Sequence, residues 1–132
     1  MRTVFIFWLA LLSSTAATSA ETPKLPKGAI QLDGAEIVQW LNGKTFRNVV
    51  IYDASVPITA TTNWNSTKMR VSGTYVAGGN KGKFDNEWII NGDTSCTEKT
   101  ADGKWICQKV FMLGDVMYEV NRKGKLHAIS KP

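Results

Sequence analysis

The sequence predicts a mainly β protein, a small antiparallel up-and-down barrel of about eight strands with one short N-terminal helix. Two observations favour this fold: polar and apolar residues alternate in many short stretches, and turn residues recur about every ten positions between them. Only one segment carries the capping residues of a helix. A two-sheet β-sandwich is the alternative, because it has the same pattern of short strands and turns.

The chain of 132 residues has room for one folded domain. Arg2 precedes an apolar run from Val4 to Leu12, and small or polar residues follow up to Ala20, so residues 1–20 are expected to be a secretory signal peptide. That run is too short to span a bilayer, which takes about 20 apolar residues. We therefore expect an exported protein, periplasmic or secreted after cleavage near Ala20, with no transmembrane segment in the mature chain.

The mature chain is expected to begin with an extended lead-in over residues 21–31, rich in proline and lysine, followed by a single barrel domain over residues 32–132. The one helix is predicted over residues 34–42. Asp33 is a good N-cap, and Glu36 stands where a capping box requires it. Leu32 can pack on Ile37, and Gly43 supplies the left-handed stop.

The predicted strands follow the helix. Clear alternation covers residues 69–75, 84–90 and 116–120, and weaker strand patterns cover residues 46–53, 57–62, 94–98, 105–113 and 125–130. Turn residues separate these segments, for example Asn91-Gly92-Asp93 and Lys123-Gly124.

The two cysteines are expected to form a disulfide. Cys96 and Cys107 flank Asp102-Gly103, a hairpin turn signal, so they should lie opposite or nearly opposite each other on adjacent strands. An exported protein meets an oxidising compartment, where such a bond persists. A redox-active pair usually has two residues between its cysteines, which is not the spacing here. In the chain-entropy model the bond stabilises the fold by about 3 kcal/mol.

A set of framework residues runs through most of the mature chain: Leu32, Gly34-Ala35-Glu36-Ile37, Leu41, Gly43-Lys44-Thr45, Gly82, Trp88, Gly92-Asp93, Cys96, Cys107, Tyr118, Val120, Gly124-Lys125 and His127. With these residues the chain resembles small exported alphaproteobacterial proteins of unknown function that have a lipocalin-like barrel. The resemblance implies that fold and no catalytic residues. The segment from Pro57 to Thr67 departs from it, since a shorter turn is expected there.

Aromatic residues suggest two kinds of binding site. Tyr75, Trp88, Trp105 and Tyr118 are candidates to line a cavity for a small apolar ligand, although a small barrel also fills its interior with such side chains. Trp88 has the phase of a core residue.

The other aromatic candidate is Trp64, which with Asn63 and Asn65 is expected to form a polar loop. Such a loop is either a partner-contact site or a cap over one barrel end.

No catalytic constellation is evident, and we expect no enzyme. The sequence has one histidine, His127, which is expected to be an exposed strand residue; Glu119 or Asp115 lies close enough along the chain to approach it across a hairpin. Asp85 and Glu87 share the polar face of one strand and are expected to be solvated. One histidine and two cysteines cannot build a histidine-rich or four-thiolate centre, so no metal or other cofactor is expected.

The chain is basic, with a formal charge of +5 that falls to +4 when Arg2 is removed with the signal peptide. Arg122, Lys123 and Lys125 form the densest basic surface and favour an anionic partner. Nucleic acid is not expected as a partner of an exported protein that has no basic-aromatic RNA motif.

Together these features predict a non-catalytic, exported β-barrel binding protein for an unknown small apolar ligand, an envelope protein or a polysaccharide. The alternatives are a secreted inhibitor of a hydrolase such as lysozyme, and a hydrolase that uses Glu119 and His127.

Overall fold

A computed structural model describes residues 22–132. The predicted signal peptide and its cleavage site lie outside the described residues. The elements in chain order are β1 (Ile30–Gln31), α1 (Gly34–Leu41), β2 (Thr45–Ile51), β3 (Ile58–Asn65), β4 (Arg70–Ala77), β5 (Asn80–Glu87), β6 (Ile89–Asn91), β7 (Thr94–Lys99), β8 (Trp105–Leu113), β9 (Val116–Val120) and β10 (Leu126–Lys131).

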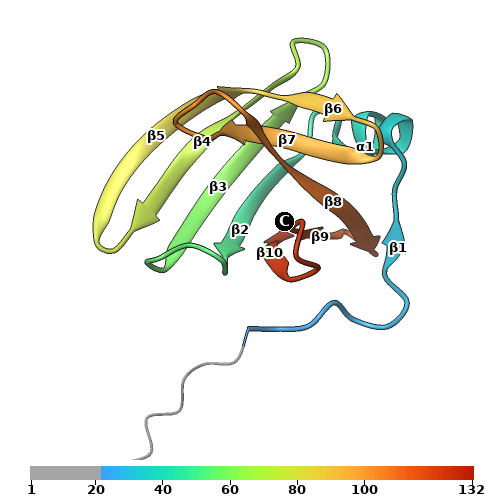
Figure 1. The fold of residues 1–132 in the computed structure, drawn as a ribbon, viewed down its shortest axis with the longest axis horizontal. Helices are drawn as coiled ribbons and strands as arrows, with labels where there is room; N and C mark the ends of the chain where they lie inside the picture. Colours follow the sequence, from blue (N-terminus) through green and yellow to red (C-terminus); the bar gives the residue numbers. More distant parts are fainter. Residues whose placement is uncertain (1–21) are drawn as a thin grey trace, which may run out of the picture.

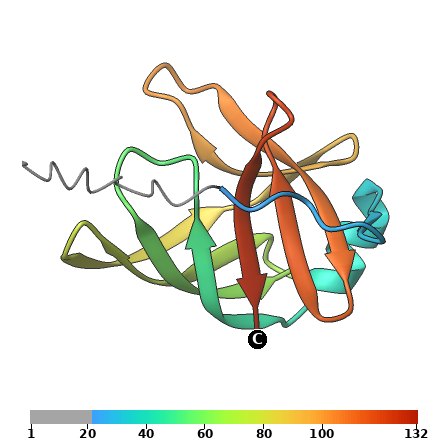
Figure 2. The ribbon, with the colours of Figure 1, turned by 90° about the horizontal axis from the view of Figure 1, so that it is seen from below.

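The predicted mainly β, antiparallel fold is confirmed. One strongly curved sheet runs in the order β5-β4-β3-β2-β10-β9-β8-β7-β6 and forms a half-barrel (Figure 1; Figure 2). Consecutive strands are paired within β2–β5 and within β6–β10, as in two meanders, and the pairing of β2 with the last strand, β10, joins the two. The path ends at β5 and β6, and within the described residues β5 is not hydrogen-bonded to β6 or β7.

The helix forms as predicted. The Asp33 side chain accepts a hydrogen bond from the Glu36 backbone at 2.8 Å, and the Glu36 side chain accepts one from the Asp33 backbone at 3.0 Å. Ile37 and Leu41 are fully buried. The helix therefore covers one end of the half-barrel, with its apolar face in the core.

The predicted disulfide is confirmed. Cys96 and Cys107 are directly opposite each other on β7 and β8 and are bonded. The turn between these strands is closed by a hydrogen bond from the Thr100 backbone to the Lys104 carbonyl at 2.8 Å, and Gly103 has the left-handed backbone that the turn requires.

Two strand predictions need correction. The expected strand over residues 84–90 is divided at Trp88, whose fully buried indole donates a hydrogen bond to Ser95 at 2.9 Å. Because β5 pairs with β4 and β6 pairs with β7, the chain has to leave one side of the half-barrel for the other at this residue. The expected lead-in over residues 21–31 also contains a strand, because Ile30 and Gln31 pair with β8.

The predicted loop at Asn63, Trp64 and Asn65 is wrong. These residues complete β3, which pairs with β4 along its full length. Trp64 is only 5% exposed and packs edge to face on Trp88, with ring centroids 5.0 Å apart. Asn63 and Asn65 point to the exposed outer face of the sheet, so no aromatic contact loop forms here.

Gly73 in β4 permits the tight coiling of the sheet. A Cβ atom at this position would overlap the carbonyl oxygen of Thr61 on β3. No flexible side chain end can move aside here, because the obstacle is backbone.

We therefore expect Gly73→Ala to lower the free energy of unfolding by about 2 kcal/mol, as overpacking in a core does. Urea denaturation followed by tryptophan fluorescence measures this. Ser72→Ala, one position along the same strand, is the control and should be close to neutral. Equal stability of the Gly73→Ala and wild-type proteins would contradict this account of the curvature.

Candidate functional site

The half-barrel encloses a cavity of about 270 Å³, which we call the lumen. Ile51 and Ile58 line it next to the β2–β3 turn, and Ala77 lines it next to the β4–β5 turn. The helix packs at the opposite ends of these strands, where Trp40 contacts Phe46. The lumen is therefore at the end of the half-barrel that α1 does not cover.

Most of the lumen wall is apolar. The apolar and aromatic lining residues come from β2, β3, β4, β5 and β10: Val49, Ile51, Ile58, Ala60, Trp64, Val71, Tyr75, Ala77, Phe84 and Ala128. Tyr75 keeps its position because its partner on β5 is Gly82, where a Cβ atom would overlap the tyrosine ring. An aromatic side chain covering a strand glycine is a known way to stabilise a curved sheet.

Two polar atoms of the lumen wall have no hydrogen-bond partner within the described residues, the Thr62 hydroxyl and the Trp64 indole nitrogen. Both residues are on β3, two positions apart, so their side chains lie on the same face of the strand, the one that lines the lumen. Buried polar groups are nearly always paired in folded proteins, since an unpaired one costs about 1–3 kcal/mol. The Thr62 hydroxyl and the Trp64 indole nitrogen are therefore polar positions of the lumen wall that residues 22–132 leave without a partner.

Glu119 is the buried carboxyl group of the lumen wall; Glu98, also in the lining, is exposed. Glu119 lies on β9 opposite Ala128 and is only 8% exposed. Burial raises the pKa of the Glu119 carboxyl above its ordinary value of 4.5; nearby His127 lowers it in part, and Glu98 and Asp53 raise it further. The neutral form of the carboxyl is thus favoured over a wider pH range than in an exposed glutamate.

A β-bulge turns His127 toward the lumen. Leu126 pairs with Val120 and Ala128 pairs with Glu119, so β10 has one residue more than β9 at His127. An extra residue of this kind changes the direction of a side chain relative to regular strand alternation. The prediction of an exposed histidine is wrong, because the side chain is 14% exposed and lines the lumen.

The partner of His127 is Asp53, two residues after the end of β2. The His127 Nδ1 and Asp53 Oδ1 atoms are 2.6 Å apart. The Asp53 carboxylate also accepts a hydrogen bond from the Asn121 side chain at 3.1 Å. Sequence reasoning missed Asp53 because 74 positions separate it from His127, and only the pairing of β2 with β10 brings them together.

The four residues predicted to line a cavity are not gathered in one place. Tyr75 lines the lumen, and Trp88 is in the core beside it. Trp105 lies on the outer surface, where the Lys99 ammonium is 4.4 Å from its ring centroid. Tyr118 points to the face of β9 opposite that of Glu119, since the two residues are adjacent on a strand.

The remaining charged candidates are on the surface. Asp85 pairs with Arg70 at 2.8 Å, and Glu87 on β5 lies 3.9 Å from Lys99 on β7. Arg122, Lys123 and Lys125, the predicted basic surface, are exposed around the β9–β10 turn.

Within residues 22–132, no group of three or more histidine, cysteine, aspartate or glutamate residues is arranged to hold a metal ion. No helix in this part of the chain is long and apolar enough to cross a membrane. Comparisons of the chain with protein-family models, with curated proteins and with solved structures found no match.

The burial of Glu119 predicts how stability changes with pH. Because the pKa is raised in the folded state, the folded chain holds this proton more strongly than the unfolded chain, and stability should fall as pH rises above about 4.5 toward the raised pKa. The substitution Glu119→Gln removes the titrating carboxyl and with it this pH-dependent loss of stability. At pH 7 the variant should be more stable by about 1 kcal/mol or more, the usual cost of a buried polar group with incomplete pairing.

Urea denaturation of Glu119→Gln and wild type at pH 4 and pH 7 measures the difference. The higher free energy of unfolding of the Glu119→Gln variant should be present at pH 7 and nearly absent at pH 4. Glu87→Gln, at an exposed position outside the lumen, is the matched control and should change stability little at either pH. A glutamine variant that is less stable than wild type at pH 7 would contradict the predicted charge burial.

Proposed function

We propose that this protein is an exported, non-catalytic binding protein whose lumen holds a small, mostly apolar ligand with one polar group. The observation that carries the proposal is the presence of two buried, unpartnered polar atoms, on Thr62 and Trp64, in an otherwise apolar cavity. Ligand sites commonly combine apolar walls with a few polar groups that fix the ligand's orientation.

The volume of the lumen limits the size of the ligand. Known small-molecule sites are typically about 300–1,000 Å³. At about 270 Å³ the lumen is near the lower end of that range, so it suits a compact molecule rather than a long-chain lipid.

The polar groups favour a ligand with a hydrogen-bond acceptor. The Trp64 indole can only donate, and the Thr62 hydroxyl can donate or accept. A protonated Glu119 carboxyl, which its raised pKa favours, is a further donor. A neutral carbonyl, ether or hydroxyl group on the ligand satisfies these donors, and no charge is required on it.

The contacts of Asp53 and His127 support a structural role over a catalytic one. Asp53 accepts hydrogen bonds from the ring of His127 and from Asn121, and so ties the end of β2 to the beginning of β10 and the turn before it. General-base catalysis would also require a nucleophile or a substrate proton within reach of the histidine. The pair thus holds one wall of the lumen in place.

Export is supported by two features of the chain. The first 20 residues have the pattern of a signal peptide. The Cys96–Cys107 disulfide is typical of proteins that work outside the cytoplasm, where thiols are not kept reduced.

Filling the lumen tests the proposal. Ala60 faces inward and lines the lumen, whereas Thr59 is exposed on the outer face of the same strand. We expect Ala60→Leu to weaken binding of the fluorescent naphthalene ketone prodan, an apolar molecule with a carbonyl acceptor, by about tenfold or more because it occupies the ligand's space. Thr59→Leu, the matched control, should bind prodan as wild type does.

The measurement is a titration of prodan fluorescence at fixed protein concentration, with thermal unfolding to verify that both variants fold. Absence of prodan binding by the wild-type protein would count against a lumen that takes acceptor-bearing apolar ligands. Equal loss in both leucine variants would place the prodan site elsewhere and would contradict the proposal.

A further inference from the structure

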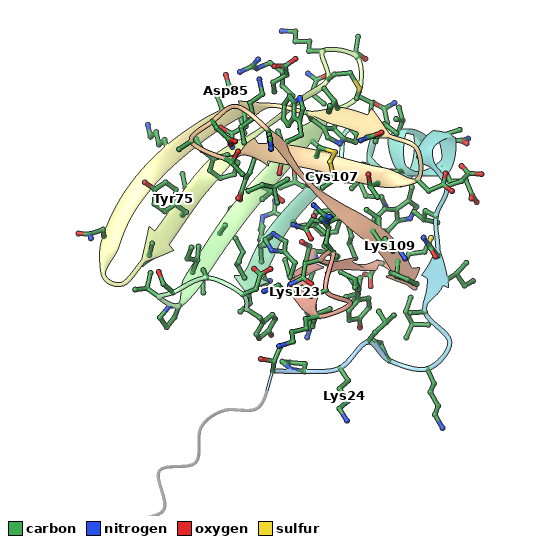
Figure 3. The ribbon with its side chains drawn as sticks, viewed as in Figure 1. Lys24, Tyr75, Asp85, Cys107, Lys109 and Lys123 are labelled. Atoms are coloured by element: carbon green, nitrogen blue, oxygen red, sulfur yellow. A yellow bond between two sulfur atoms is a disulfide. The ribbon has the colours of Figure 1, made fainter. Side chains whose placement is uncertain are left out.

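A second and larger hollow lies on the outside of the half-barrel. This groove has a volume of about 870 Å³ and runs between the lead-in, residues 22–25, and the outer side of β8, β9 and the β9–β10 turn. In Figure 2 the lead-in crosses the face of β9 and β10, and Figure 3 shows Lys24, Lys109 and Lys123 around this region.

The groove exists because β8 separates from β9. The pairing of these strands begins at Lys109 and Val120 and extends only toward Leu113 and Val116. The first half of β8 pairs with β7 alone, and the chain after Val120 turns away into residues 121–125. The separated segments form the two sides of the groove.

The groove is strongly basic. Among residues 22–132, its lining contains one carboxylate and five cationic side chains: Lys24, Lys109, Arg122, Lys123 and Lys125. Within residues 22–132, none of these five forms an ion pair. A concave surface lined by charges of one sign concentrates the electrostatic field and attracts ligands of the opposite sign.

The one carboxylate does not offset this charge freely, because Asp53 is already engaged by His127 and Asn121. Asn121 also orders the basic turn. Its side-chain oxygen accepts hydrogen bonds from the Lys123 and Lys125 backbones at 3.0 and 3.1 Å. The cations of the turn are therefore presented from a fixed backbone.

The lining of the groove also has uncharged parts. Leu25 and Phe111 supply apolar surface on the outer side, whereas Ile106 and Gln108 share the phase of the core residue Val110 and line the groove where β8 has separated from β9. Gln108 is only 6% exposed, and its side-chain oxygen has no hydrogen-bond partner within the described residues. A ligand for this groove thus has anionic groups for the cations, apolar faces for the apolar lining and a hydroxyl group for Gln108.

We infer that the groove binds an acidic oligosaccharide, a sugar chain that carries carboxylates. Its carboxylates pair with the lysines and Arg122, the C–H faces of its sugar rings lie on the apolar lining, and a sugar hydroxyl donates to the Gln108 oxygen. A free inorganic anion would leave the apolar lining and Gln108 without contacts. This site is separate from the lumen, and the inference does not depend on the proposed function.

Charge reversal tests the inference with a control of equal charge. We compare the full-length mature protein with the double variants Arg122→Glu/Lys123→Glu, in the groove, and Lys81→Glu/Lys83→Glu, on β5 outside it. All four positions are exposed. Binding of oligogalacturonate, of uncharged malto-oligosaccharide and of vesicles containing anionic phospholipid is measured by titration, and thermal unfolding verifies that the variants fold.

We expect oligogalacturonate to bind the wild-type protein and malto-oligosaccharide to bind much more weakly. The groove variant should lose about tenfold or more in affinity for oligogalacturonate, and the β5 variant less than about twofold. Equal losses in both variants would mean attraction by net charge alone and would overturn the inference. So would absence of oligogalacturonate binding, or binding confined to the vesicles.

Discussion

The pairing of β2 with β10 is the constraint on which both hollows of the molecule depend. It joins the four-stranded meander of β2–β5 to the five-stranded meander of β6–β10, so that the two form one curved sheet. Its register places Ile51 opposite Ala128, and the Tyr52 backbone donates to the His127 carbonyl at 2.8 Å. Asp53 is thereby held beside the beginning of β10, where His127 leaves regular strand alternation.

The Asp53–His127 pair lies in the wall between the lumen and the groove. His127 lines the lumen and Asp53 lines the groove, so one contact of 2.6 Å contributes to both. On the lumen side the pair acts on the pKa of Glu119. On the groove side, the contact with His127 engages Asp53, the one carboxylate that the described residues place in the lining beside five cations. The electrostatic character of each hollow thus depends on the same two residues.

Local signals in the sequence predicted most of the fold. The capped helix, the disulfide hairpin and the alternation of most strands depend on neighbouring residues, so they could be read from short segments. The polar neighbours of Trp64 favour a loop, although Thr62 and Trp64 also alternate with Asn63 and Asn65 as they do in the observed strand. The site was harder to predict. The β10 bulge and the β2–β10 register decide which side chains face the lumen, and neither can be recognised from a short segment of sequence.

The central claim is that the lumen receives a ligand with a hydrogen-bond acceptor. The NMR resonance of the Trp64 indole N–H tests it most directly. Its ¹⁵N–¹H resonance can be followed while 2-heptanone, or heptane as the matched compound without a carbonyl, is added. We predict that the ketone shifts the Trp64 resonance downfield and that heptane does not, while Trp105, outside the lumen, is unchanged by either. An unchanged Trp64 resonance, or the same shift with heptane, would contradict the claim.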